Sequence, residues 1–386
     1  MQFRDIIGYE SIKGELRKIS SSGHIPHNIL FEIEDGMPGV ALALAWIQYL
    51  NCESPLDGDS CGVCPQCKMI SQLAHPDVHY IYPVINASEA ETPSDDFLEN
   101  WREMIENEGA EFDHETWLRY LKATKQQPII YSKDALALEH KLSISTSEGK
   151  YRMVIIYEPD RMNETAANKL LKLMEEPPDK TIIVSVCFAV DALLETVISR
   201  MQRFEIRPLS PKELREGLLE SHPSASENEI QRALLRSNGI LLRARQLAAN
   251  NITQRKYSEL FEKMIEYIIT KDVLALKKLS EKIETEGREW IIAALSYFEE
   301  CFRLSFTGSF TGHNTYGVSP NEQMFFIALQ DCISLKNIET IYKTTESAIH
   351  HIRGNVSAKM VLFDTFLRYT AALSPAFKAK GISSLR

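Results

Sequence analysis

The chain has 386 residues, of which 44% are hydrophobic and 25% are charged, and its formal net charge is -10. This length suffices for two or three ordinary domains, and no run of about 20 apolar residues predicts a membrane span, so we expect a multi-domain cytoplasmic protein. The negative charge argues against a free-standing nucleic-acid binder, because neutralising phosphates requires clustered Lys and Arg side chains.

The first expected strand, residues 28–33, is followed by a tight turn and an apolar helix expected over 40–50. This order is typical of a phosphate-binding loop, which needs glycines, a lysine and a Ser or Thr in the pattern G-x4-G-K-[ST]. In the register set by the strand and helix, the diagnostic places hold Ile33, Pro38, Gly39 and Val40. No Lys or Arg occurs between Lys18 and Lys68. The degenerate loop predicts that ATP hydrolysis is absent, while weak binding by backbone N–H groups at the helix N-terminus stays open.

Four of the seven cysteines are crowded into one segment. Their spacing is Cys52-x8-Cys61-x2-Cys64-x2-Cys67. Such spacing lets four thiolates converge on one tetrahedral Zn²⁺, and a fully protein-bound ion is structural because it leaves no position for water. Disulfides and an iron–sulfur cluster are the competing interpretations, the first disfavoured in a cytosolic chain. The other cysteines, Cys187, Cys301 and Cys332, lie in apolar surroundings and are expected to be buried core thiols.

Residues 86–127 hold most of the negative charge, with eleven acids against four bases. Apolar residues at helical spacing, including Trp101 and Trp117, predict a helical insertion. We expect a solvated insertion. A partner-docking surface built on the two tryptophans is the alternative.

Further short apolar runs with little alternation predict strands that are buried on both faces. They occupy residues 78–83, 152–158, 181–187 and 203–209. A helix after the third strand, with Asn163 as N-cap and Pro177 as part of its stop, adds to an alternation of strands and helices. This alternation predicts a doubly wound parallel sheet with its ligand crevice at the carboxyl ends of the strands.

The third strand lacks an acidic residue at the place where a magnesium ligand is ordinarily found. Tyr157 stands there instead, followed by Glu158 and Asp160. With no triphosphate cradle opposite them, we expect these two acids to be solvated loop residues.

The run from 155 to 187, IIYEPDRMNETAANKLLKLMEEPPDKTIIVSVC, resembles the clamp-loader branch of the AAA+ proteins of bacterial DNA polymerase III. The family pattern A-N-x-L-L-K-x-x-E-E-P-P is met between Ala167 and Pro178. The resemblance to this family extends over nearly the whole chain except the acidic insertion. The resemblance implies a non-hydrolysing member of a ring that opens the sliding clamp and loads it onto primed DNA. An ATP-hydrolysing motor subunit, or another AAA+ ATPase, is the alternative.

The segment VISRMQRF carries one piece of chemistry that the resemblance implies. Family members have a Ser-Arg-Cys motif whose arginine reaches the ATP of the adjacent subunit. Ser199 and Arg200 match it, and Met201 replaces the cysteine. Arg200 is therefore expected to act in trans as an arginine finger, with Ser199 supporting it.

The resemblance also implies three domains and a set of partners. The expected boundaries are 1–209 for the AAA+ core with a zinc module at 52–67, 210–252 for a small helical lid, and 253–386 for a helical collar that holds the ring together. Long amphipathic patterns after residue 253 predict a helical bundle independently. The implied partners are the ATPase and delta subunits of the ring, and through them the clamp and primed DNA.

Overall fold

The computed structural model describes residues 1–86, 91–123, 127–143, 149–223, 225–249, 252–310, 326 and 329–382. The chain divides into two compact units, the first comprising Met1–Gly217 and Gly239–Leu242 and the second Leu218–Asn238 and Arg243–Arg386. Among the described residues, no helix has the length and apolar character needed to cross a membrane. The division into core, lid and collar stays a prediction.

The first unit is built on a five-stranded sheet in which every pairing is parallel. The strand order is β2-β3-β4-β1-β5, so β1 lies between β4 and β5. The predicted doubly wound parallel sheet is confirmed, and all seven residues of β4 are buried. The strands are β1 Asn28–Glu32, β2 Val78–Ile81, β3 Arg152–Tyr157, β4 Thr181–Cys187 and β5 Gln202–Glu205.

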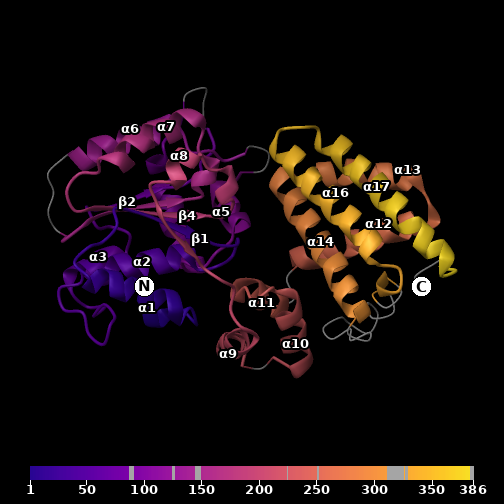
Figure 1. The fold of residues 1–386 in the computed structure, drawn as a ribbon, viewed down its shortest axis with the longest axis horizontal. Coiled ribbons are helices and arrows are strands. Elements are labelled where there is room, and N and C mark those ends of the chain that lie inside the picture. The colour runs from indigo at the N-terminus through magenta and orange to yellow at the C-terminus, as the bar shows by residue number, and fades with distance from the viewer. Residues whose placement is uncertain are drawn as a thin grey trace. The chain divides into compact units, whose positions relative to one another are not determined.

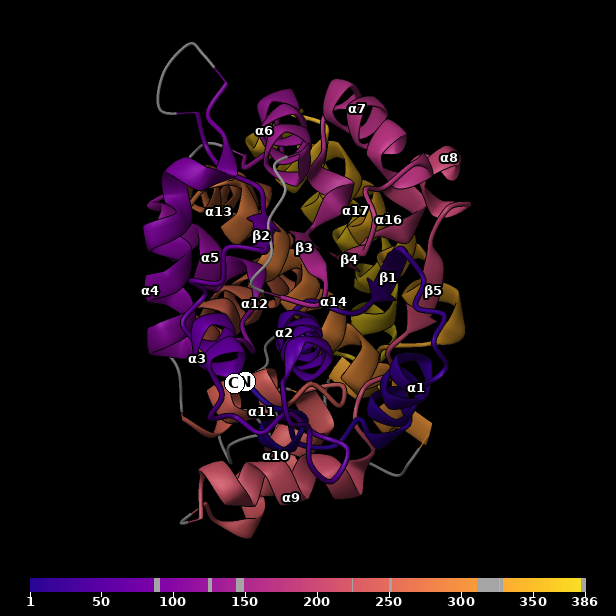
Figure 2. The same ribbon diagram turned by 90° about the vertical axis from the view of Figure 1, so that its left-hand side faces the viewer.

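Helices cover both faces of this sheet (Figures 1 and 2). One face carries α6 (Ser132–Ser143), α7 (Glu164–Glu175) and α8 (Glu195–Ile198), and the other carries α1 (Glu10–Ser21), α2 (Gly39–Asn51) and α3 (Pro65–Ser71). Helix α7 begins as predicted, since Asn163 Oδ1 accepts a hydrogen bond from the backbone N–H of Ala166 at 2.7 Å. Its residues Leu170 and Met174 pack with Val154 and Ile183 of the sheet in one apolar cluster.

The acidic insertion forms α4 (Leu98–Glu108) and α5 (His114–Leu121), which confirms its helical character. Trp101 and Trp117 are both 0% exposed. Trp101 stacks on Tyr82 with ring centroids 4.3 Å apart, and the ring of Trp117 lies 5.1 Å from that of Trp101. The alternative of a docking surface built on these tryptophans is therefore wrong, because they form an internal aromatic cluster. The predicted solvated insertion describes its outer side, where Glu103 and Glu106 are exposed, and is wrong for the buried tryptophans.

The second unit is helical, as predicted. Its apolar core includes Phe302, Phe366 and Tyr369, each of which is 0% exposed. The hydroxyls of Thr345 and Tyr369 share a hydrogen bond of 2.6 Å inside this core. Its helices are α10 (Glu227–Arg236), α12 (Ile252–Thr270), α13 (Val273–Glu284), α14 (Arg288–Phe310), α16 (Leu335–Arg353) and α17 (Ala358–Ala379), while α9 (Pro211–Ser221) and α11 (Leu241–Ala248) are shared between the units.

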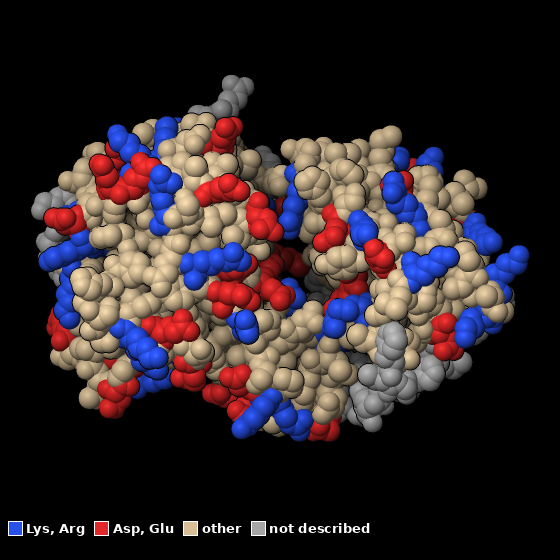
Figure 3. Space-filling view, viewed as in Figure 1, with Lys and Arg blue, Asp and Glu red and all other residues tan. Residues whose placement is uncertain are grey.

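The lone cysteines and the surface charges follow the sequence-based expectations. Cys187, Cys301 and Cys332 are buried, with at most 2% exposure. On the face drawn in Figure 3, Lys and Arg side chains are interspersed with Asp and Glu side chains. Such a mixed surface does not have the clustered positive charge of a nucleic-acid-binding face.

Candidate functional site

The ligand crevice of a doubly wound sheet lies at the carboxyl ends of its strands, where β1 leads into α2 and β3 leads into a loop. Residues 33–38 connect β1 to α2, and Gly39 is the first residue of that helix. Ile33, Pro38, Gly39 and Val40 are all buried. The loop therefore occupies the position of a phosphate-binding loop but fills it with apolar groups.

Gly39 stands where a phosphate-binding loop has its lysine, and the structure leaves no room there for a side chain. A Cβ on Gly39 would lie 2.6 Å from Cδ1 of Ile33 and 2.6 Å from Cγ1 of Val186. Both neighbours are buried branched side chains, and packed interiors yield little to such overlaps. The site has thus lost both the cation and the space for it.

Backbone N–H groups of the same loop are also engaged. Met37 donates to the carbonyl of Glu34 at 3.1 Å, Gly39 donates to that of Met37 at 2.8 Å, and Ile33 donates to that of Cys187 at 3.1 Å. A phosphate-binding loop works by directing such N–H groups at its anion. These three donors are turned to the loop's own carbonyls and to β4 instead.

Glu158, the first residue after β3, is 0% exposed, so the expectation of a solvated loop acid is wrong for it. Its Oε1 lies 2.6 Å from Nδ1 of His114, and its Oε2 forms an ion pair with Arg161. Burial alone would raise the pKa of Glu158, but the charges of His114 and Arg161 outweigh burial and lower it to about 2. Glu158 is therefore ionised and already paired.

Two further carboxyl groups line the crevice. Burial and the nearby Asp113 raise the pKa of Asp35 to about 7, against the lowering effect of His114. Burial also raises the pKa of Asp160, whose Oδ1 accepts a hydrogen bond from the Cys187 thiol at 3.4 Å. Neither group supplies the positive charge that the lysine of a phosphate-binding loop provides.

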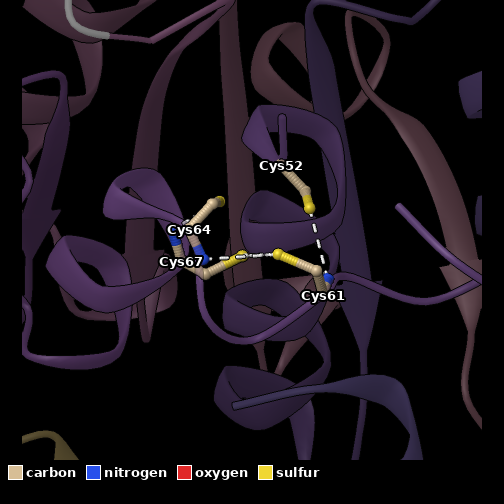
Figure 4. A group of neighbouring side chains, drawn as sticks. All are labelled: Cys52, Cys61, Cys64 and Cys67. Carbon is tan, nitrogen blue, oxygen red and sulfur yellow. Dashed lines mark hydrogen bonds between the residues drawn. The ribbon is translucent and has the colours of Figure 1, made fainter. Parts of the chain in front are cut away.

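The four clustered cysteines form the second candidate site (Figure 4). Cys52 follows the last residue of α2, Cys64 is the N-cap of α3, and Cys67 lies within α3. The four Sγ atoms all lie within 4.8 Å of one another, and those of Cys61 and Cys67 are 3.9 Å apart. Sulfur atoms about 2.3 Å from a tetrahedral Zn²⁺ stand about 3.8 Å apart, so this cluster could hold zinc.

Backbone geometry around the cluster also suits thiolate ligands. The N–H of Cys61 donates to Sγ of Cys52 at 3.2 Å, and the N–H of Cys64 donates to Sγ of Cys61 at 3.4 Å. Hydrogen bonds from the backbone of Val63 and Cys64 lower the pKa of Cys61 to about 6. Burial raises the pKa of Cys67, a cost that a bound cation would offset.

Arg200 lies two residues after the end of the short helix α8, and its side chain is 35% exposed. One guanidinium nitrogen lies 2.6 Å from Oε1 of Glu175 at the end of α7, and another donates to the carbonyl of Thr196 at 2.7 Å. The side-chain amide of Asn28 donates to the carbonyl of Arg200 at 3.3 Å. Ser199 is exposed beside it, so the predicted pair lies on the surface and not in the core.

Sequence reasoning missed Asp35, His114 and Asn28. His114 lies inside the acidic insertion, and the charge composition of that segment gives no indication that His114 pairs with Glu158 after β3. Asn28 is the polar first residue of β1 and precedes an apolar run. A buried asparagine needs hydrogen-bond partners, so its place in the sequence is the local signal that it binds the segment carrying Arg200.

The parallel sheet, the loop between β1 and α2 and the helices on both faces define an AAA+ core in which neighbouring side chains fill the space at the lysine position. The family model described as "DNA polymerase III, delta subunit" matches residues 8–210. The chain belongs to this family, and with it to the clamp-loader proteins of DNA polymerase III.

Curated relatives agree with this family. The chain is 28% identical over 202 residues to the delta prime subunit of DNA polymerase III from Bacillus subtilis, covering 52% of this chain and 48% of that protein. It is 23% identical over 216 residues to the tau subunit from Escherichia coli, covering 56% of this chain and 27% of that protein. The chain thus matches half or less of the length of these relatives. A gamma subunit-related structure from Thermotoga maritima aligns with 93% of this chain and 98% of that one at 18% identity, but its TM-score of 0.41 carries no conclusion.

Proposed function

We propose that this chain is a delta prime subunit of the bacterial clamp loader, a ring member that binds its neighbours but does not hydrolyse ATP. The observation that carries the proposal is the closed crevice, in which Gly39 stands at the lysine position with Ile33 and Val186 in the way of any side chain. A motor subunit needs a lysine on the β- and γ-phosphates and a free acid on Mg²⁺. Here the lysine is missing and Glu158 is held by His114 and Arg161.

The alternative of an ATP-hydrolysing motor is favoured by the likeness to tau and gamma subunits. That likeness covers the AAA+ fold, which hydrolysing and non-hydrolysing members would share. The residues that carry out hydrolysis distinguish the two roles, and the missing lysine of this chain favours the non-hydrolysing one.

Arg200 is the residue through which this subunit would contribute to hydrolysis. A guanidinium is planar and permanently charged, which suits it to charge developing on a transferred phosphate. The exposed position of Arg200 would allow its guanidinium to contact the nucleotide of a neighbouring subunit. Ser199 would support the turn that carries Arg200. The helices after residue 253 would serve as the collar, and a zinc ion held by the four cysteines would be structural.

Reconstitution tests this proposal. The purified chain, mixed with the ATPase and delta subunits of its own organism, is expected to co-elute with them as one complex that loads the clamp onto primed DNA. Without the chain, loading should fall to background. A photoreactive ATP analogue should label the ATPase subunits but not this chain. A chain that neither co-elutes nor affects loading, or that takes the label as strongly as the motors do, would overturn the proposal.

A further inference from the structure

The acidic insertion reaches into the nucleotide crevice from a distant part of the sequence. The backbone N–H of His114, the first residue of α5, donates to Oδ1 of Asp35 at 2.8 Å. Its ring Nδ1 donates to Oε1 of Glu158 at 2.6 Å. One residue of the insertion therefore bonds both to the loop after β1 and to the residue after β3.

Packing supports the same contact. The ring of Phe112 lies 5.3 Å from that of Tyr157, the last residue of β3, and 5.4 Å from that of Trp101 in α4. Aromatic contacts at these distances fix the insertion against the strand end. The segment before α5 thus packs against the end of β3.

Asp113 is the N-cap of α5 and stabilises the first turn of that helix. Its Oδ1 accepts hydrogen bonds from the N–H and hydroxyl of Thr116, at 2.8 Å and 2.7 Å. This cap fixes the first turn of α5, so that the N–H and ring of His114 are presented to the crevice in one orientation.

A bound nucleotide in this class of fold does two mechanical things. Its phosphates fix the loop after the first strand, and its Mg²⁺ links those phosphates to an acid after another strand. In this chain the corresponding loop and acid are linked by His114. In a nucleotide-binding relative, ligand binding would stabilise the ordered form of these two segments. In this chain the contacts of His114 stabilise it instead.

We propose that residues 112–114 of the insertion are an internal ligand that contacts both loops of the nucleotide crevice and holds them together. The subunit then keeps one conformation whether or not ATP is present. This inference rests on the proposed function for its role in the ring, but the contact itself concerns the isolated chain. It also gives the insertion a partner, which is the chain's own degenerate ATP site.

Hydrogen exchange on the full isolated chain tests the inference. The amides of Met37, Gly39, Arg161 and Met162 are hydrogen-bonded within the two loops and report on their order. In His114→Ala these amides should exchange at least tenfold faster, because a buried charge-assisted hydrogen bond is lost. His114→Gln, which can still donate to Glu158, should restore part of the protection. Adding ATP and Mg²⁺ to the unaltered chain should leave both loops unchanged.

Arg119→Ala is the matched control, since Arg119 lies in the same helix but pairs with Glu108 at the surface. It should leave the loops protected. The inference is overturned if His114→Ala exchanges at the loops no faster than Arg119→Ala and the unaltered chain do. It is also overturned if ATP slows exchange in the loops of the unaltered chain. If His114→Ala does not fold, His114→Gln decides between these outcomes. A ring that assembles normally while the loops fail this test would separate the inference from the proposed function.

Discussion

Arg200→Ala in a reconstituted clamp loader should lower ATP turnover at the neighbouring active site by about 10³-fold or more, the usual contribution of an arginine finger. The physical reason is the loss of a planar cation at developing phosphate charge. Arg200→Lys should recover little, because an ammonium cannot make the paired hydrogen bonds of a guanidinium. Turnover is measured with saturating clamp and primed DNA, and is compared with nucleotide binding by the motors, which should change much less.

The ion pair of Arg200 does not prevent this role. Glu175 is 49% exposed, and exposed ion pairs contribute about 0–1 kcal/mol, so exchanging the carboxylate for a neighbour's phosphate costs little. Glu175→Ala should therefore retain full turnover. Arg203→Ala is the matched control, because Arg203 is another exposed arginine close by in β5. Turnover in Arg200→Ala equal to that of Arg203→Ala would remove Arg200 from the mechanism.

Removal of zinc is expected to unfold the cysteine segment and to loosen the N-terminus with it. Structural zinc in small modules contributes about 10–16 kcal/mol of apparent binding free energy. The segment is tied to the chain start, since Asp59 accepts the N–H groups of Phe3 and Arg4 at 3.1 Å and 3.0 Å. Cys64→Ser should therefore speed hydrogen exchange over residues 52–71 and lower the Tm by about 5 °C or more.

Metal analysis provides the direct check on that site. About one zinc per chain is expected in the unaltered protein and in the control Cys332→Ala, which removes a buried thiol outside the cluster. Cys64→Ser should lose most of the metal. Iron and sulfide in place of zinc, or a chain whose stability is indifferent to a chelator, would contradict a structural zinc.

Most of the fold could be predicted because its signals are local. The five apolar runs overlap the five strands, and Asn163 caps α7 as its position before an apolar-periodic segment indicated. The prediction that all five are buried on both faces is wrong for β5, in which only Phe204 is buried. The same holds for the missing lysine, which is a fact of composition. Strand order and the packing of the insertion depend on contacts between distant residues, and a single sequence carries no pattern for them.

The errors concerning the crevice have this origin. Glu158 is predicted to be solvated because no triphosphate cradle faces it, but its partner His114 is 44 residues away in the chain. Asp35 is bonded to the same histidine across 79 residues. The high acidity of residues 86–127 indicated solvation, while Trp101 and Trp117, which are buried, decided where the helices pack. Charge composition describes the outer face of such a segment and not its inner one.

Titration of the isolated chain with a fluorescent ATP analogue and Mg²⁺ tests the closed crevice most directly. We expect no saturable binding at micromolar concentrations and no turnover, since the lysine is absent and Gly39 has no space for one. An ATPase subunit of the same loader, titrated in parallel, should bind. Micromolar binding with steady hydrolysis by this chain alone would contradict the account.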